Sequence, residues 1–180
     1  LTYSIVGGLD ASSFGITSGG ALTFLTTPNF EIPTDSNTNN IYHVDVQVSD
    51  GSLTTTQSIT VTVTNVNEIP SITSSATASV AENTTAVTTV TATDPDAFST
   101  LTYSIIGGVD ATKFSINAAT GALSFMSTPD FETPTDTGTN NVYNVTVQVS
   151  DGALSVTQAI AVTVTNVHET PTVTSATAAS

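Results

Sequence analysis

A pair of nearly identical segments, about 100 residues apart, limits most strongly what this chain can fold into. LTYSIVGGLDASSF at 1–14 returns as LTYSIIGGVDATKF at 101–114, and the segment at 27–51 returns at 128–152. This period is too long for a solenoid and fits an array of whole domains. We therefore divide the chain into a first repeat at 1–68 that lacks its first two strands, a complete second repeat at 69–169 and the start of a third at 170–180. Because the chain opens in the middle of a strand pattern, we expect it to be part of a longer protein.

Short runs of alternating apolar and polar residues, separated by turn residues, predict β-strands throughout the second repeat. In the sixth run, Tyr143, Val145, Val147 and Val149 should point inward. The matching run of the first repeat should bury Tyr42, Val44, Val46 and Val48. Seven strands are the number of an immunoglobulin-like sandwich, so the sequence predicts an all-β chain of tandem seven-stranded Greek-key sandwiches. The expected strands lie near 72–80, 86–93, 101–106, 113–117, 122–126, 142–150 and 154–167.

The composition excludes several classes of function. One Lys+Arg against fifteen Asp+Glu gives a net charge of −14, which argues against nucleic acid and anionic membrane as partners. The absence of cysteine excludes disulfides and thiolate chemistry. No apolar run is long enough to predict a membrane span in this segment. No nucleophile lies near a base in the pattern, and we expect no enzyme.

The carboxylates are concentrated at the ends of the expected domains. If consecutive strands run antiparallel, every connecting loop is assigned to one end of its repeat, and only Asp45 of the fifteen acids lies on a strand face. Stacking the two repeats end to end would then bring seven acids toward one seam. These are Asp10, Glu31, Asp35, Glu68, Asp94, Asp96 and Asp151.

Such crowding favours a divalent cation. Two carboxylates 4 Å apart repel by about 4 kcal/mol at an effective dielectric constant of about 20. The chain offers almost no Lys or Arg to relieve this repulsion. Ca²⁺ takes six to eight oxygen ligands from carboxylates, amides and carbonyls. We therefore predict calcium at the joint between repeats, with Asn65 and Asn67 as additional oxygen donors.

Five short motifs, in order, resemble those of the cadherin repeat, specifically the cadherin-like repeats of bacterial surface proteins. AEN at 81–83 is similar to the family's proline-glutamate-asparagine motif, TDPD at 93–96 to its paired aspartates, and DFE at 130–132 to its Asp-Arg-Glu motif. The strand ending in SDG and the linker NVNEIP at 65–70 also match. The resemblance implies Ca²⁺ ligands at the complete seam and at a seam to the third repeat. For the complete seam they are Glu31, Asn67, Glu68, Asp94, Asp96 and Asp151; for the other they are Glu82, Asp130, Glu132 and Glu169.

Some positions depart from the family pattern. Asn65 and Asn166 replace the first aspartate of the linker, Asn29 stands where the second repeat has Asp130, and His168 replaces Asn67. Each change removes a ligand or ligand charge, so we expect one or two weaker ions at the seam rather than three.

Other acids have simpler interpretations. We expect DSNTNN at 35–40 and DTGTNN at 136–141 to be turn-rich connections rather than calcium loops, since they lack a closing glutamate. We expect Asp10 and Asp110 to cap a short helical turn.

The sequence thus favours a non-enzymatic structural or adhesive segment of a secreted, extracellular or cell-surface protein. Its partners would be neighbouring repeats of the same or identical chains, and a cell-surface or matrix ligand is a further possibility. The alternative is a subunit of a self-assembling extracellular filament or sheath, completed by a strand from a neighbouring chain. A lectin-like or homophilic binding module ranks last, because the faces carry few aromatic residues.

Overall fold

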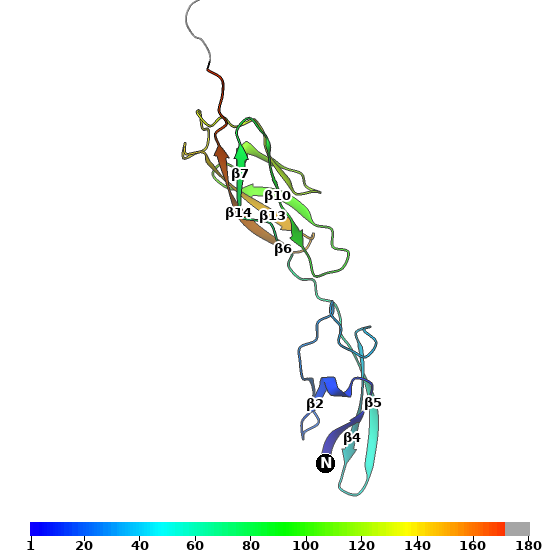
Figure 1. Ribbon diagram of the computed structural model, residues 1–180. Coiled ribbons are helices and arrows are strands. Elements are labelled where there is room, and N and C mark those ends of the chain that lie inside the picture. Colours follow the sequence, from blue (N-terminus) through cyan, green and yellow to red (C-terminus); the bar gives the residue numbers. More distant parts are fainter. Residues whose placement is uncertain (172–180) are drawn as a thin grey trace, which may run out of the picture. The chain divides into compact units, whose positions relative to one another are not determined.

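The computed structural model describes residues 1–171, which form two compact units (Figure 1). Unit 1 is Leu1–Asn67, and unit 2 begins at Glu68. The predicted all-β fold is confirmed, because the regular elements of the described residues are strands apart from one 3₁₀ turn in each unit. The expected start of a third repeat falls largely outside the described residues.

The described part of unit 2 has nine strands in two main sheets and one short two-stranded ladder. The four-stranded sheet has the order β10-β13-β14-β7, the three-stranded sheet the order β11-β12-β8, and β6 pairs with β9. The strands β7 and β14 run parallel and lie side by side in Figure 1. The elements are β6 Ser71–Ile72, β7 Thr77–Ala81, β8 Ala86–Thr89, β9 Ala92–Thr93, β10 Thr102–Gly107, the 3₁₀ turn η2 Ala111–Lys113, β11 Phe114–Ile116, β12 Ala122–Phe125, β13 Val142–Ser150 and β14 Ser155–Thr165.

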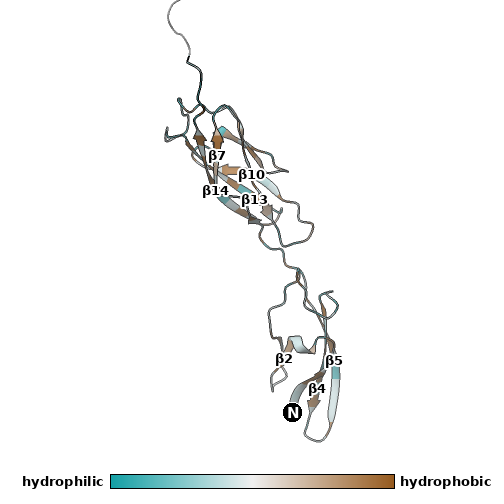
Figure 2. Ribbon diagram, viewed as in Figure 1, coloured by the Kyte–Doolittle hydropathy of each residue, from teal (hydrophilic) through white to brown (hydrophobic). Residues whose placement is uncertain are grey.

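The core of unit 2 follows the alternation of the sequence. Tyr143, Val145, Val147 and Val149 of β13 are buried, as predicted, because successive side chains of a strand point to opposite faces. In Figure 2 the strands accordingly carry both brown and paler residues. Three rings form the centre of an aromatic cluster, with centroids 4.6 Å apart for Phe114 and Phe125 and 5.1 Å apart for Phe125 and Tyr143.

Unit 1 repeats part of this arrangement. Its sheets have the orders β1-β4-β5 and β2-β3. An equivalent aromatic cluster is present, with centroids 4.5 Å apart for Phe14 and Phe24 and 5.0 Å apart for Phe24 and Tyr42. The elements are β1 Thr2–Gly7, the 3₁₀ turn η1 Ala11–Ser13, β2 Phe14–Ile16, β3 Leu22–Phe24, β4 Ile41–Ser49 and β5 Thr54–Thr62.

Two sequence predictions need correction here. The expected strands at 72–80 and 86–93 are each two strands, because each segment leaves one sheet and joins another partway along. In unit 1, Tyr42 and Val44 are buried, but Val46 and Val48 are only half-buried. The reason is that the described residues of unit 1 include no counterparts of β6 to β9, which cover these positions in unit 2.

Candidate metal centre

Glu82 is a buried carboxylate at the end of unit 2 where β7 stops. Its side chain is 2% exposed. Its Oε2 accepts a hydrogen bond from the backbone N–H of Phe131 at 2.8 Å, and its Oε1 accepts one from Val167 at 2.7 Å. These two bonds lower the pKa of Glu82 below its ordinary value, since they favour the ionised form. Glu82 therefore connects three segments of the chain and remains charged at neutral pH.

The loop that carries Asp130 and Glu132 is held in place by hydrogen bonds to both backbone groups of Phe131, the residue between them. The N–H of Phe131 is bonded to Glu82, and its carbonyl accepts the side-chain amide of Asn141 at 2.9 Å. The Oδ1 of Asp130 accepts the N–H of Thr133 at 2.9 Å, which closes a local turn. The two acids are thus positioned by the backbone that lies between them.

Glu82, Asp130 and Glu132 together form the acidic cluster. One oxygen from each lies within 4.8 Å of the other two. Asp130 and Glu132 are exposed, so a cation can reach the cluster from solvent. The chain contains a single Lys or Arg side chain, that of Lys113, against fifteen acids. Each carboxylate oxygen can accept more than one interaction, so the bonds to the backbone leave room for a metal.

The donor set of the acidic cluster fits calcium. All three groups are hard carboxylate oxygens, the ligands that Ca²⁺ prefers, and no sulfur or ring nitrogen is among them. Two asparagines extend the set toward the segment after β14. Asn166 donates to Oε1 of Glu132, and Asn83 donates to Oε1 of Glu169 at 3.3 Å. Glu169 thereby contacts the residue that follows Glu82, and its role as a metal ligand stays a prediction.

A second group of acids belongs to the other predicted set in unit 2. The Oδ1 of Asp94 accepts the N–H of Asp96 at 2.9 Å, and the Oδ2 of Asp96 accepts the N–H of Glu68 at 2.9 Å. Carboxylate oxygens of Glu68 and Asp96 come within 4.8 Å of each other. The structure therefore brings Glu68 and Asp96 together at the start of unit 2. Glu31 and Asn67 belong to unit 1, and their participation stays a prediction.

Asp151 organises a turn. Its Oδ1 accepts the N–H groups of Ala153 at 2.7 Å and Leu154 at 2.6 Å, between β13 and β14. Asp50 makes the same pair of bonds in unit 1, to Ser52 and Leu53. The turn role accounts for the aspartate in both repeats, and metal binding by Asp151 stays a prediction.

The prediction that Asp10 and Asp110 cap a helical turn is wrong. Both occupy the N-cap position, but neither makes a side-chain cap hydrogen bond. Asp10 instead accepts the backbone N–H groups of Ser36 at 2.6 Å and His43 at 2.8 Å. Asp110 accepts those of Thr137 at 2.7 Å and Asn144 at 2.8 Å. These carboxylates point into the unit because a distant loop and strand offer N–H donors there.

The same bonds control the ionisation of these two acids. Burial raises the pKa of Asp10, but the hydrogen bonds from the backbone of His43 and Ser36 outweigh it, so the pKa lies below its ordinary value. The pKa of Asp110 is lowered by the same balance. Asp10 and Asp110 are therefore structural anions, and the expectation that Asp10 adds to the acids of a seam is not supported by these contacts.

The connections at 35–40 and 136–141 are turns of the kind predicted. Asp35 accepts the N–H groups of Asn39 at 2.9 Å and Asn40 at 3.0 Å. Asp136 accepts those of Asn140 and Asn141, both at 3.0 Å. The final asparagine of each loop has a positive φ, a conformation that asparagine tolerates better than most residues.

Two positioning residues were not assigned a role from the sequence. Asn141 holds the loop of the acidic cluster through the carbonyl of Phe131, and Asn40 makes the equivalent bond to Phe30 at 2.8 Å. The repeated Asn-Asn pair at 39–40 and 140–141 was the available signal. Asn166 was noted only as a departure from the family, although its amide contacts Glu132.

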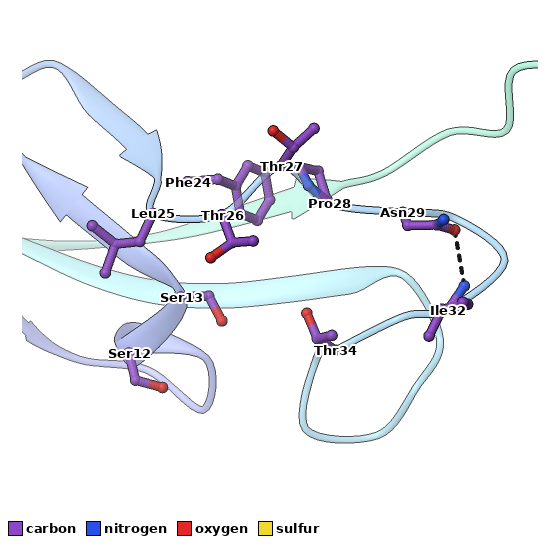
Figure 3. A pocket seen from close by; sticks show the side chains of 10 residues that line it. All are labelled: Ser12, Ser13, Phe24, Leu25, Thr26, Thr27, Pro28, Asn29, Ile32 and Thr34. Atoms are coloured by element: carbon purple, nitrogen blue, oxygen red, sulfur yellow. Dashed lines mark hydrogen bonds between the residues drawn. The ribbon is translucent and has the colours of Figure 1, made fainter.

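A cavity of about 470 Å³ lies in unit 1 between η1 and the loop after β3 (Figure 3). Beside it, Asn29 Oδ1 accepts the N–H groups of Glu31 at 2.8 Å and Ile32 at 3.0 Å, so Asn29 forms the turn that Asp130 forms in unit 2. The lining residues are apolar groups, hydroxyls and one amide, without a carboxylate or histidine. Its two serines, Ser12 and Ser13, therefore have no general base within the lining.

Comparisons with known proteins agree with the β-sandwich fold described above. Residues 76–167 match the model of the cadherin domain. Among the solved structures that resemble the chain are three structures of cadherin repeats. Mouse cadherin-23 EC22-24 is 24% identical with a TM-score of 0.60, over 92% of this chain and 53% of the other. Drosophila N-cadherin EC1-4 is 17% identical with a TM-score of 0.64, over 91% and 42%. Human protocadherin-24 EC1-2 is 19% identical with a TM-score of 0.63, over 94% and 82%.

The chain thus spans about half or less of the length of the first two of these structures. A search of curated protein sequences gave no match. Within residues 1–171, no helix is long and apolar enough to cross a membrane.

Proposed function

Because the chain belongs to the cadherin family, whose domains are extracellular adhesive repeats, we propose that it is a structural segment whose joints are stiffened by calcium. The segment would do no catalysis. Its work would be to hold successive sandwiches in a fixed arrangement at the cell surface or in a secreted protein. Partners would be neighbouring repeats of the same or identical chains, together with a cell-surface or matrix ligand.

The acidic cluster is the observation that carries this proposal. Three carboxylates with oxygens within 4.8 Å of one another repel, by about 4 kcal/mol for a pair about 4 Å apart at an effective dielectric constant of about 20 and by less where water screens the exposed Asp130 and Glu132. The acidic cluster is nevertheless held in place, because the N–H groups of Phe131 and Val167 donate to Glu82 and the carbonyl of Phe131 accepts a hydrogen bond from Asn141. A bound divalent cation would reverse the sign of this electrostatic contribution.

We assign the proposed ligands to two calcium sites. The site after β7 and β14 would use Glu82, Asp130, Glu132 and Glu169. The site at the start of unit 2 would use Glu68, Asp94, Asp96 and Asp151, together with Glu31 and Asn67 from unit 1. The ion would supply positive charge that links segments otherwise kept apart by repulsion. The asparagines at 29, 65 and 166 lower the ligand charge, so we expect affinities in the range of extracellular modules, with Kd about 10⁻⁴–10⁻³ M.

A calcium titration followed by thermal unfolding tests the proposal. At tenfold excess over Kd, one site stabilises by about 1.4 kcal/mol, which raises the Tm of a domain of this size by about 5–10 °C. Mg²⁺ should be less effective, because it demands a rigid octahedral shell. Small-angle scattering of the full chain should show a smaller spread of dimensions in calcium than in EDTA.

Three variants make this experiment specific. Asp130→Asn and Glu132→Gln should reduce the calcium-dependent rise in Tm of unit 2, while Asp45→Asn should leave it unchanged. The Asp45→Asn variant is a matched control, since it also removes one negative charge, but from a strand of unit 1 outside the acidic cluster. Equal stability in calcium and EDTA for the unmodified chain would refute the calcium role.

The second candidate function is a filament subunit completed by a strand from a neighbouring chain. The physical reason for considering it is that an open sheet edge can recruit a strand from another chain. Sedimentation of the full chain over a range of concentrations distinguishes the candidates, because a filament subunit should grow into larger species.

A further inference from the structure

Two Asp-Gly pairs, each in the turn of a β-hairpin, carry a chemistry that the proposed function does not use. They are Asp50–Gly51, between β4 and β5, and Asp151–Gly152, between β13 and β14. No other aspartate or asparagine of the sequence precedes a glycine. Because glycine has no Cβ, its backbone nitrogen is the least hindered in approaching the side-chain carboxyl of the residue before it. The two pairs are therefore the positions where the sequence most favours ring closure between an aspartate side chain and the main chain.

The reaction open to such a pair is a rearrangement of the peptide bond that needs only water. The glycine nitrogen attacks Cγ of the aspartate, an N–C bond forms, and the amide hydrogen leaves together with the carboxyl OH as water. Water then adds to the former main-chain carbonyl of the five-membered imide and breaks its bond to nitrogen. The product is isoaspartate, in which the main chain runs through Cβ and Cγ and the α-carboxylate is free. No electrons are gained or lost, and the protonated carboxyl is the reactive form.

In both hairpins the aspartate is held by backbone N–H groups that follow it. Asp50 Oδ1 accepts the N–H groups of Ser52 at 2.8 Å and Leu53 at 2.7 Å, and Asp151 makes the equivalent two bonds. The bonds from Leu53 and Ser52 lower the pKa of Asp50 below its ordinary value, because they favour the ionised form. An ionised carboxylate has no OH to leave as water, so these bonds keep the side chain in its unreactive form.

The attacking nitrogen is held by the residue that precedes the aspartate. The N–H of Gly51 donates to Oγ of Ser49 at 3.1 Å, and the N–H of Gly152 donates to Oγ of Ser150 at 3.0 Å. The hydroxyl of Ser150 itself donates to the carbonyl of Leu154 at 2.9 Å. Ring closure has to break the glycine bond, since this N–H hydrogen is the one that leaves. The same serine is present in both repeats, and both partners of the reaction are thus engaged elsewhere in the turn.

We propose that Asp50–Gly51 and Asp151–Gly152 are sites of spontaneous conversion to isoaspartate, and that the closed hairpin keeps them unconverted. Conversion then follows opening of the hairpin, because opening releases the carboxylate and the glycine nitrogen together. The product has one more main-chain atom in the turn, and its carboxylate is one carbon closer to the main chain, so the original turn cannot form again. Each converted residue therefore marks a hairpin that has opened, and it weakens that hairpin afterwards.

Ageing of the full chain, folded and unfolded, tests the proposal. One sample is kept in neutral buffer and the other in enough urea to unfold it, both with EDTA, so that the outcome does not depend on the proposed calcium sites. Isoaspartate is measured with a protein isoaspartate methyltransferase, which methylates the free α-carboxylate. Incubation in heavy-oxygen water labels every residue that has passed through the imide, which separates this conversion from any that occurs during later digestion.

Mass spectrometry then assigns the conversion to each pair. Cleavage after glutamate yields the fragments 32–68 and 133–169, which contain one Asp-Gly pair each. The same fragments contain Asp45 and Asp136 as internal controls, since these aspartates precede valine and threonine. We expect conversion at Asp50 and Asp151 in urea, a rate at least about tenfold lower in the folded sample, and far less conversion at the two control residues. After refolding, the sample aged in urea should melt at a lower temperature than the sample aged folded.

Serine variants test the hold on the glycine nitrogen. Ser150→Ala removes the acceptor of one glycine N–H and leaves the other hairpin intact. In the folded chain it should speed conversion at Asp151 about threefold or more, with Asp50 in the same molecule unchanged. Ser49→Ala should give the reverse pattern. In urea both variants should convert at the rate of the unmodified chain, because the turn is absent there.

The possible outcomes separate the parts of the proposal. Equal rates in the folded and unfolded samples would overturn protection by the hairpin. Absence of isoaspartate from both pairs in urea would overturn their assignment as sites of conversion. Serine variants that convert no faster than the unmodified chain when folded would overturn the role of the hydroxyls, and an unchanged Tm after refolding would overturn the weakening of the converted hairpin.

Discussion

Replacing Glu82 by Gln should destabilise unit 2 even without calcium. The carboxylate satisfies two backbone N–H groups, those of Phe131 and Val167, at 2.8 and 2.7 Å. A glutamine offers one carbonyl oxygen and turns its NH₂ toward the other donor. One charge-assisted hydrogen bond, worth about 1.5–3 kcal/mol, is lost, and a buried N–H is left without an acceptor at a further cost of about 1–3 kcal/mol.

The combined loss of unfolding free energy is therefore about 2.5–6 kcal/mol, which lowers the Tm of a domain of about 100 residues by about 10 °C or more. Differential scanning calorimetry of the full chain in EDTA measures it. Glu132→Gln is the matched control, because Glu132 is exposed and its removal relieves repulsion in the absence of the ion. If Glu82→Gln melts within about 3 °C of the unmodified chain in EDTA, Glu82 does not tie the three segments together, and its burial has been misinterpreted.

The remaining predictions concern the two units. Asp10 and Asp110 have pKa values below the ordinary 3.8 in the folded state, so the stability that they contribute is present above pH 3.8 and is lost as the pH falls through the folded pKa. Acid titration monitored by circular dichroism should therefore show unfolding below about pH 4. The midpoint pH of this unfolding should be higher in Asp110→Asn, which lacks the contribution of Asp110. Val147→Ala should cost about 2 kcal/mol in chemical denaturation, and Val46→Ala less than half of that, because only Val147 is fully buried. Equal losses would show that unit 1 is covered in solution. Asn141→Ala should weaken calcium binding about tenfold or more by releasing Phe131, with calorimetric titration as the measurement; unchanged affinity would show that Glu82 alone holds the loop.

The fold was predictable because its main signal has a period of two residues. Tyr143, Val145, Val147 and Val149 alternate with polar residues over a whole strand, and all four are buried. The split of 72–80 and 86–93 was not predictable, because switching between sheets changes the partner of a strand and not its alternation.

The acids were predicted less completely than the strands. Glu82, Asp130 and Glu132 come together as the motif order implied. Asp110 looked like a helix cap because its local sequence is that of a cap, but its donors, Thr137 and Asn144, lie far along the chain. Local propensity cannot anticipate such bonds, since they depend on how separate segments pack.

The two hydrogen bonds that hold the backbone of Phe131 bear on how fast a cation would bind to the acidic cluster and leave it. The N–H and carbonyl of Phe131 are both engaged by side chains that belong to the folded unit, so Asp130 and Glu132 are arranged before any ion arrives. Capture of a cation there would require shedding of its water shell and little rearrangement of the chain. Exchange would then be fast, and a surface built from such repeats would follow changes in the surrounding medium without a lag set by refolding.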